Sequence, residues 1–183
     1  MILRRSSPLV PISLLAVFVI FADQLSKWWI IEHMLRGNPA YGFLHWLTHT
    51  GGQESFAPIP VTSFFNLVMV WNKGISFGLF QNHTTMMPYI LSALGLAITI
   101  GFLWWARHAT AKLIIIATGF IVGGALGNIW DRLRFGAVAD FFDVYINTSH
   151  WPAFNVADSA ISVGVVLLLI HLLLEKPAIQ KPE

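Results

Sequence analysis

Long uninterrupted runs of apolar residues alternate with shorter polar segments along this chain. Four of these runs reach the length of about 20 residues that a helix needs to cross a hydrocarbon layer. They cover residues 8–31, 88–106, 113–131 and 155–174. Runs such as VVLLLIHLLL do not alternate between apolar and polar residues, so they indicate helices rather than the strands of a membrane barrel. The pattern therefore predicts four transmembrane helices.

The first run follows Arg4 and Arg5, which is also how a cleaved secretory leader begins. A leader ends at a cleavage site made of small residues. This run instead continues into the polar sequence DQLSK at residues 23–27 and then into further Trp and Ile residues. We therefore expect the first span to be retained as a transmembrane helix.

The composition of the 183 residues agrees with a membrane protein. Apolar residues make up 56% of the chain and charged residues only 11%, whereas about a quarter of the residues of a soluble domain are charged. The net charge is +2 and no dense basic cluster is present, so nothing predicts binding to nucleic acid. The absence of cysteine excludes disulfides, thiolate metal sites and a cysteine nucleophile.

Basic residues near the ends of the spans indicate the orientation, because cytoplasmic loops are rich in Lys and Arg. One side holds the basic residues before the first span, between the second and third, and after the fourth: Arg4, Arg5, Arg107, Lys112, Lys176 and Lys181. The opposite side holds Arg36, Lys73, Arg132 and Arg134, and its first loop is poor in basic residues for its length. We predict a multi-pass protein with both termini in the cytoplasm.

The segment 32–85 is too long to be a simple connection between the first two spans. Its second half contains the apolar runs SFFNLVMVW and ISFGLF, and the sequence NKG between them predicts a turn joining two strands. We expect a membrane all-α protein with a small β-rich cap on the extracytoplasmic face. Residues 1–183 are interpreted as one membrane-embedded domain, and the part of the loop before Ser63 has no predicted role.

The carboxylates are concentrated at one end of the predicted bundle. Four of the five Asp residues lie between the end of the third span and the start of the fourth: Asp131, Asp140, Asp143 and Asp158. An ionisable group near the hydrocarbon is costly and is therefore a candidate functional group. Asp131 lies next to Arg132 and close to Arg134, which favours an ion pair at the membrane interface. Asp143 follows two Phe residues in a predicted loop and is expected to be solvated.

Other polar and small residues inside the spans have structural interpretations. Asp23 and Lys27 lie one helical turn apart, so they share a helix face and form a structural polar pair. Glycines recur every four residues in the third span, from Gly119 through Gly123 to Gly127, and predict a smooth face for close helix contact. Asn128 follows that face. A hydrogen bond between helices and a locally satisfied side chain fit its spacing equally well.

Asp140 and Asp158 have no obvious partner nearby in the sequence. On one continuous helix their separation of 18 residues would hold them about 27 Å apart. The polar sequence at residues 147–152, NTSHWP, predicts a chain reversal that returns the fourth span beside the third. The two carboxyls are then expected to meet near the outer membrane surface.

Two carboxyls that meet in surroundings of low polarity cannot both ionise, so they share one proton. Aspartic proteolysis uses this state: the ionised carboxyl takes a proton from water, and the protonated carboxyl donates to the peptide carbonyl.

Two other function classes are compatible with the same residues. A small proton-coupled transporter would use Asp140 and Asp158 to bind and release protons, although transporters usually show more spans and paired half-repeats. A non-enzymatic membrane assembly factor would use its polar residues only to hold helices together, and it would tolerate Asn at both positions. His45 and His49 have the spacing of helical metal ligands but no third ligand, so no metal site is predicted.

With these residues identified, the sequence resembles the bacterial lipoprotein signal peptidase (signal peptidase II) family of membrane aspartic endopeptidases. The resemblance covers nearly the whole chain. It is carried by DQLSK at residues 23–27, FNLV at 65–68 with WNKGISF at 71–77, GGALGNIWDR at 123–132, and VADF at 138–141 with FNVADS at 154–159. The resemblance implies that Asp140 and Asp158 are the catalytic dyad.

The resemblance also implies supporting residues and a substrate. The residues that would support the dyad are Asn128, Arg132, Asn155 and Ser159. Asn72 and Gly74 would belong to the outer cap near the substrate. The implied substrate is a prolipoprotein with a diacylglyceryl group on its lipobox Cys, cut just before that Cys without any cofactor. The implied location is the bacterial cytoplasmic (inner) membrane, with the active site near its extracytoplasmic face, and we expect a monomer among membrane lipids.

Overall fold

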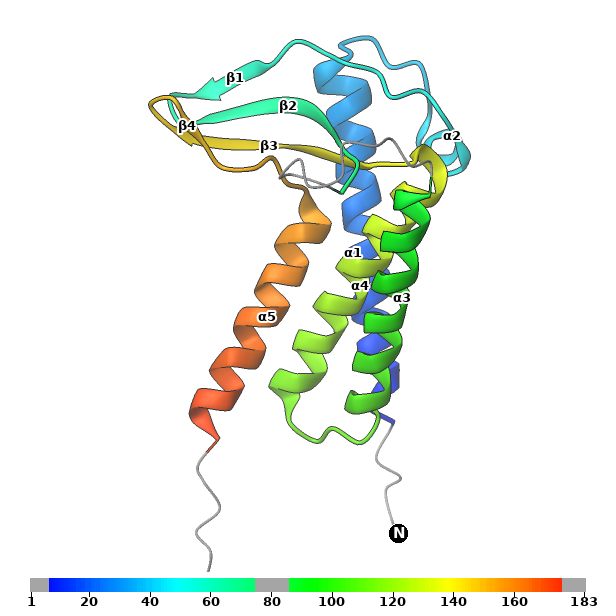
Figure 1. Ribbon diagram of the computed structural model, residues 1–183, viewed down its shortest axis with the longest axis vertical. Coiled ribbons are helices and arrows are strands. Elements are labelled where there is room, and N and C mark those ends of the chain that lie inside the picture. The colour runs from blue at the N-terminus through cyan, green and yellow to red at the C-terminus, as the bar shows by residue number, and fades with distance from the viewer. Residues whose placement is uncertain (1–6, 75–85, 176–183) are drawn as a thin grey trace, which may run out of the picture.

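The structure is a computed structural model that describes residues 7–74 and 86–175. Within these ranges four helical spans are long and apolar enough to cross a membrane, and one four-stranded sheet lies at one end of them (Figure 1). The four predicted spans are confirmed. They are α1 (Leu9–Trp28) continuing as the π-helix η1 (Trp29–Leu35), α3 (Met87–Ala106), α4 (Lys112–Phe135) and α5 (Val156–Leu174).

Helix α4 is the centre of the bundle and contacts α1, α3 and α5. Its glycines allow this close packing. A Cβ atom at Gly123 would lie 2.8 Å from the carbonyl oxygen of Ala16 in α1, and one at Gly124 would lie 2.3 Å from the carbonyl oxygen of Ala157 in α5. Because no side chain fits at either position, the predicted small-residue face of this span is confirmed.

The sheet lies across the helix ends that are opposite to the start of α1 and the end of α5 (Figure 1). Strands β1 (Ile59–Thr62) and β2 (Phe65–Asn72) come from the segment between the first two spans. Strands β3 (Val138–Ile146) and β4 (Ser149–His150) come from the segment between α4 and α5. All neighbouring strands are antiparallel, and β2 pairs with both β1 and β3. The predicted small sheet at one end of the helices is therefore confirmed. The segment between the first two spans does not build it alone, because β3 and β4 come from the segment between α4 and α5.

The prediction of a loop after the third span is wrong for residues 138–146, which form β3. The first four residues of β3 are all buried, so the strand shows no alternation of apolar and polar residues that would reveal it. The partner strand predicted at residues 75–80 lies outside the described residues. In the described part of the sheet, β2 pairs with β1 and β3.

The residues before Ser63, which had no predicted role, form part of the core of the cap. The short helix α2 (Phe43–Thr48) buries Trp46, whose ring lies 5.5 Å from the ring of Phe135 at the end of α4. The carbonyl oxygen of Trp46 accepts a hydrogen bond from Arg134. This segment therefore anchors the cap to the end of α4.

Candidate active site

Asp140 and Asp158 meet around a single residue, Asn155, where the sheet joins the helices. Asp140 lies in β3 and Asp158 in the first turn of α5. The side chain of Asn155 donates from Nδ2 to Oδ1 of Asp140 at 2.7 Å, and its backbone N–H donates to Oδ2 of Asp158 at 3.2 Å. The structure thus places the two carboxyls at one site, although their elements are separated by a chain reversal.

Asn155 can contact both carboxyls because it is the N-cap of α5. Its backbone is extended, with φ −130° and ψ −174°, and its Oδ1 accepts from the backbone N–H of Asp158 at 2.9 Å. The return hydrogen bond from its own N–H to the Asp158 carboxylate completes a capping box. The local sequence Asn-x-x-Asp therefore starts the helix and orients Asp158 at the same time.

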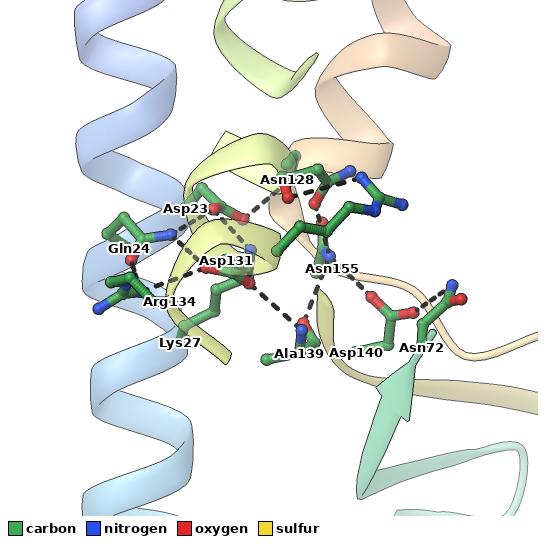
Figure 2. A network of polar contacts seen from close by, with 12 residues as sticks. Asp23, Gln24, Lys27, Asn72, Asn128, Asp131, Arg134, Ala139, Asp140 and Asn155 are labelled. Carbon is green, nitrogen blue, oxygen red and sulfur yellow. Dashed lines mark hydrogen bonds and ion pairs between the residues drawn. The ribbon is translucent and has the colours of Figure 1, made fainter. Parts of the chain in front are cut away.

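Two further asparagines complete the hydrogen bonding of the pair (Figure 2). Asn72, at the end of β2, donates from Nδ2 to Oδ2 of Asp140 at 3.0 Å. Asn128 in α4 donates from Nδ2 to Oδ1 of Asp158 at 2.7 Å, and its own Oδ1 accepts from Asn155 at 3.2 Å. Each of the four carboxylate oxygens therefore accepts a hydrogen bond, and Asn128 joins α4 to α5 as an inter-helix group.

Gly74 acts on this site through Asn72. The backbone N–H of Gly74 donates to Oδ1 of Asn72 at 2.8 Å, which leaves Nδ2 of that side chain directed at Asp140. Gly74 has φ +94°, and a Cβ atom there would lie 2.0 Å from Leu91. The conformation therefore favours glycine, and a larger residue would also have to displace the end of the Leu91 side chain.

Arg132 and Ser159 lie near the pair and act on its neighbours. The Ser159 hydroxyl donates to the carbonyl oxygen of Asn155 at 2.9 Å, and Arg132 Nη1 lies 3.5 Å from the carbonyl oxygen of Asn128. The hydrogen bonds and ion pairs of the described residues include no direct contact from either side chain to the two carboxyls. Arg132 is still close enough for the charges of Asp158 and Asp140 to act on it.

The electrostatics of the site favour a protonated Asp140. Asp140 is only 1% exposed. Burial raises the pKa of Asp140 to about 7, and the negative charge of Asp158 adds to the rise, while hydrogen bonds from Asn72 and Asn155 and the charge of Lys27 limit it. A carboxyl with this pKa keeps a proton near neutral pH. Asp140 therefore keeps its proton at pH values where an isolated Asp is ionised.

A buried ionic cluster lies next to the pair (Figure 2). The predicted Asp23–Lys27 pair is present, with 2.7 Å between Lys27 Nζ and Asp23 Oδ2 and no exposure of either side chain. Lys27 Nζ also lies 2.8 Å from Oδ2 of Asp131, and Arg134 lies 3.3 Å from its Oδ1. Asp131 does form ion pairs. Its side chain is fully buried within the protein.

Gln24 belongs to the same cluster and was missed from the sequence. Its Nε2 donates to Asp23 at 3.1 Å and to Asp131 at 2.9 Å, and its Oε1 accepts from Arg134 at 2.6 Å. The only available signal was its place between Asp23 and Lys27 in an otherwise apolar span. A polar side chain there needs a partner from another helix.

Asp143 is separate from the pair, and the expectation that it is solvated is wrong. It is 7% exposed, accepts from Asn66 Nδ2 at 3.0 Å and lies 2.8 Å from His150 Nδ1. Burial acts to raise the pKa of Asp143, but the hydrogen bonds from His150 and Asn66 outweigh it and hold the pKa below its ordinary value. Asp143 therefore stays ionised and provides a comparison for Asp140 on the same strand.

The arrangement around Asn155 provides the groups that general acid–base chemistry on water requires. One carboxyl of the pair can accept a proton while the other donates one, and both are held in place by fixed asparagines. Over residues 7–74 and 86–175, no group of three or more His, Asp or Glu side chains gathers to hold a metal ion.

The sequence is similar to those of known membrane peptidases. The family model described as signal peptidase (SPase) II matches residues 15–174. The lipoprotein signal peptidase of Rhodopseudomonas palustris is 40% identical over 173 residues, which cover 92% of this chain and 95% of that protein. The lipoprotein signal peptidase of Alteromonas mediterranea is 41% identical over 119 residues, which cover 64% of this chain and 65% of that protein. The lipoprotein signal peptidase of Cupriavidus pinatubonensis is 46% identical over 112 residues, which cover 61% of this chain and 64% of that protein.

A solved structure shares the fold. A bacterial membrane enzyme, determined by the in meso method at 2.3 Å resolution, has a TM-score of 0.68 and 26% sequence identity to this chain. The superposition covers 93% of this chain and 92% of that one.

Proposed function

This chain belongs to the signal peptidase II family of membrane aspartic peptidases, and from that premise we propose that Asp140 and Asp158 are the dyad that cleaves prolipoproteins. The observation that carries the proposal is the contact of Asn155 with both carboxyls, that of the buried Asp140 and that of the half-buried Asp158. The pKa of about 7 for Asp140 supports it, because the pair then keeps one proton near neutral pH. Membership in a peptidase family removes the reason for the transporter and assembly-factor alternatives.

The proposed reaction is a direct attack by water on the peptide bond before the lipidated Cys. The ionised carboxyl takes a proton from a water molecule, whose oxygen bonds to the carbonyl carbon, while the protonated carboxyl donates its proton to the carbonyl oxygen. The tetrahedral diol then collapses: its C–N bond breaks, the diol returns a proton to one carboxyl, and the leaving nitrogen takes a proton from the other. The products are a signal peptide with a free carboxyl group and a lipoprotein with a free Cys amino group.

The proposed substrate carries a diacylglyceryl group on its Cys, and the location of the dyad suits such a substrate. Asp140 lies in β3 and Asp158 in the first turn of α5, where the sheet meets the helices. Large apolar side chains such as Val163 and Val166 are exposed further along α5. The acyl chains would remain among the helices while the peptide bond reaches the carboxyls, which corresponds to lateral entry from the bilayer.

We further propose a monomer in the bacterial inner membrane, with the dyad on the extracytoplasmic side and both termini in the cytoplasm. Arg107 is the C-cap residue of α3, and Lys112 is the first residue of α4. The end of α3 and the start of α4 lie at the end of the bundle away from the sheet (Figure 1). The start of α1 and the end of α5 share that end. This agrees with basic residues facing the cytoplasm.

The direct test is cleavage of a diacylglyceryl prolipoprotein by the purified protein, with the cut position found by mass spectrometry. Asp140→Asn and Asp158→Asn are each expected to abolish cleavage while the protein still folds and inserts. Asp143→Asn is the matched control, because Asp143 lies on the same strand and contacts neither carboxyl among the described hydrogen bonds. It is expected to retain cleavage. Turnover in either dyad variant would refute the proposed mechanism.

The lipid requirement is tested with the same protein and the same precursor without its diacylglyceryl group. The unmodified precursor is expected to be cut poorly, because it lacks the apolar chains that hold the Cys at the membrane surface. Equal rates on the two forms would contradict lateral entry and would leave the dyad untouched.

A further inference from the structure

We infer that a buried cluster of Asp23, Lys27 and Asp131, here called the Lys27 cluster, positions the dyad. It does so by accepting hydrogen bonds from the backbone N–H of the residue that precedes each aspartate of the dyad. The inference rests on the proposed function of Asp140 and Asp158. It assigns these three side chains a positioning role in catalysis beyond the neutralisation of charge in the membrane.

The contacts of the cluster with the backbone carry the inference. Asp131 Oδ2 accepts from the backbone N–H of Ala139 at 3.2 Å, and Ala139 directly precedes Asp140. Asp23 Oδ1 accepts from the backbone N–H of Ala157 at 3.0 Å, and Ala157 directly precedes Asp158. Each member of the dyad therefore follows a peptide group that is fixed by a carboxylate of the cluster.

Lys27 joins these two supports into one unit. Its Nζ lies 2.7 Å from Oδ2 of Asp23 and 2.8 Å from Oδ2 of Asp131, and none of the three side chains is exposed. Gln24 bridges the same two carboxylates through its Nε2. Since one ammonium group sets the spacing of both carboxylates, it also sets the spacing of the start of β3 relative to the start of α5.

The surroundings of Asp23 are built for this contact. Ala157 lies in the first turn of α5, where a backbone N–H has no acceptor within its own helix. Asp23 supplies that acceptor from α1. In α4, a Cβ atom at Gly127 would lie 2.9 Å from Oδ2 of Asp23, so the glycine provides the space that the carboxylate occupies.

Stability alone is a weak reason for such a cluster. Buried ion pairs lose much of their attraction to desolvation, and apolar side chains of similar volume often replace them without loss. An apolar replacement, however, cannot accept hydrogen bonds from the two backbone N–H groups. The acceptor function, rather than the charge, is therefore the property that the test must isolate.

A matched pair of double variants isolates the acceptor for Ala157. Lys27→Met with Asp23→Asn and Lys27→Met with Asp23→Leu both remove one positive and one negative charge, so their net charge equals that of the wild type. Asn keeps an oxygen that can accept from Ala157, whereas Leu has a similar size and no acceptor. We expect kcat of the Leu variant to be about 10- to 100-fold below that of the Asn variant, with KM equal within about twofold.

The rates are normalised to folded protein, measured as the monodisperse fraction in detergent. A purely structural role would lower that fraction and leave kcat per folded molecule equal in the two variants. Equal kcat values, or a difference confined to KM, would overturn the inference. The Asn variant also serves as the conservative rescue, since it restores the acceptor without restoring the charge.

A backbone substitution keeps the inference testable if the Leu variant does not fold. Lactic acid incorporated in place of Ala157 converts its peptide N–H into an ester oxygen and leaves every side chain of the cluster intact. This protein is expected to lose at least about tenfold in kcat with little change in KM. An unchanged kcat would overturn the inference.

The outcomes separate this inference from the proposed function. Cleavage that persists in Asp140→Asn would refute the dyad itself. Cleavage that is lost in Asp140→Asn, but is equal in the two double variants and unaffected by the ester, would leave the dyad in place and refute only the positioning role of the Lys27 cluster.

Discussion

Replacing Asp140 by Asn is expected to stabilise the folded protein above pH 7 while it abolishes cleavage. The pKa of Asp140 is raised from 3.8 to about 7, first by burial and then by the charge of Asp158. Between these two values the folded protein binds a proton that the unfolded chain has released. The free energy of unfolding of the wild type therefore falls as pH rises through this window, and it is lowest above pH 7.

The size of the effect follows from the same pKa values. A difference of about three pH units, at about 1.4 kcal/mol for each, means that ionised Asp140 costs the folded state about 4 kcal/mol. The amide of the variant would direct its NH₂ at a donor, either Asn72 or Asn155, and the lost hydrogen bond costs about 1 kcal/mol. The variant should therefore be more stable by about 3 kcal/mol above pH 7, and slightly less stable than the wild type near pH 4.

The assay compares thermal unfolding of the two proteins in the same detergent from pH 4 to pH 8. Asp143→Asn is a control in which the expected change in stability has the opposite sign. Hydrogen bonds from His150 and Asn66 outweigh burial and lower the pKa of Asp143, so its carboxylate stabilises the fold at neutral pH, and this contribution is lost on acidification. That variant should be less stable than the wild type at pH 7, with a gap that closes at low pH. A stability difference for Asp140→Asn that is independent of pH would refute the reasoning.

Three other outcomes are expected. The cleavage rate should fall as pH rises through about 7, because the proposed dyad loses the proton of Asp140. A rate that still climbs at pH 9 would contradict this. Asn72→Ala should move that fall to higher pH in the same profile, because the carboxylate of Asp140 loses a donor that lowers its pKa. Gly164→Ala should lower the free energy of unfolding by about 1–3 kcal/mol, because its Cβ atom would lie 2.7 Å from the carbonyl oxygen of Ala117. Gly101→Ala is the control and should leave stability unchanged, because a Cβ atom there would have nothing within 4 Å. Equal unfolding temperatures for the two variants would contradict the packing argument.

The sequence alone determined the four spans and isolated the two acids. A transmembrane segment must satisfy every backbone hydrogen bond within itself, so its length and apolar character are written into a continuous stretch of chain. Asp140 and Asp158 were distinguished because the residues next to them offer no partner for a charge. The ion pair of Asp23 with Lys27 was also readable, since residues four apart on a helix share a face.

Only the tertiary structure decided how these parts meet. Strand β3 is buried from its first residue, so it lacks the alternation by which a strand is recognised, and its partner β2 comes from a distant segment. The contact of Asn155 with both carboxyls arises where a helix cap meets that strand. Asp131 finds Lys27 only through the packing of α1 on α4. These contacts depend on distances between elements that lie far apart in the chain, and no local pattern of residues specifies them.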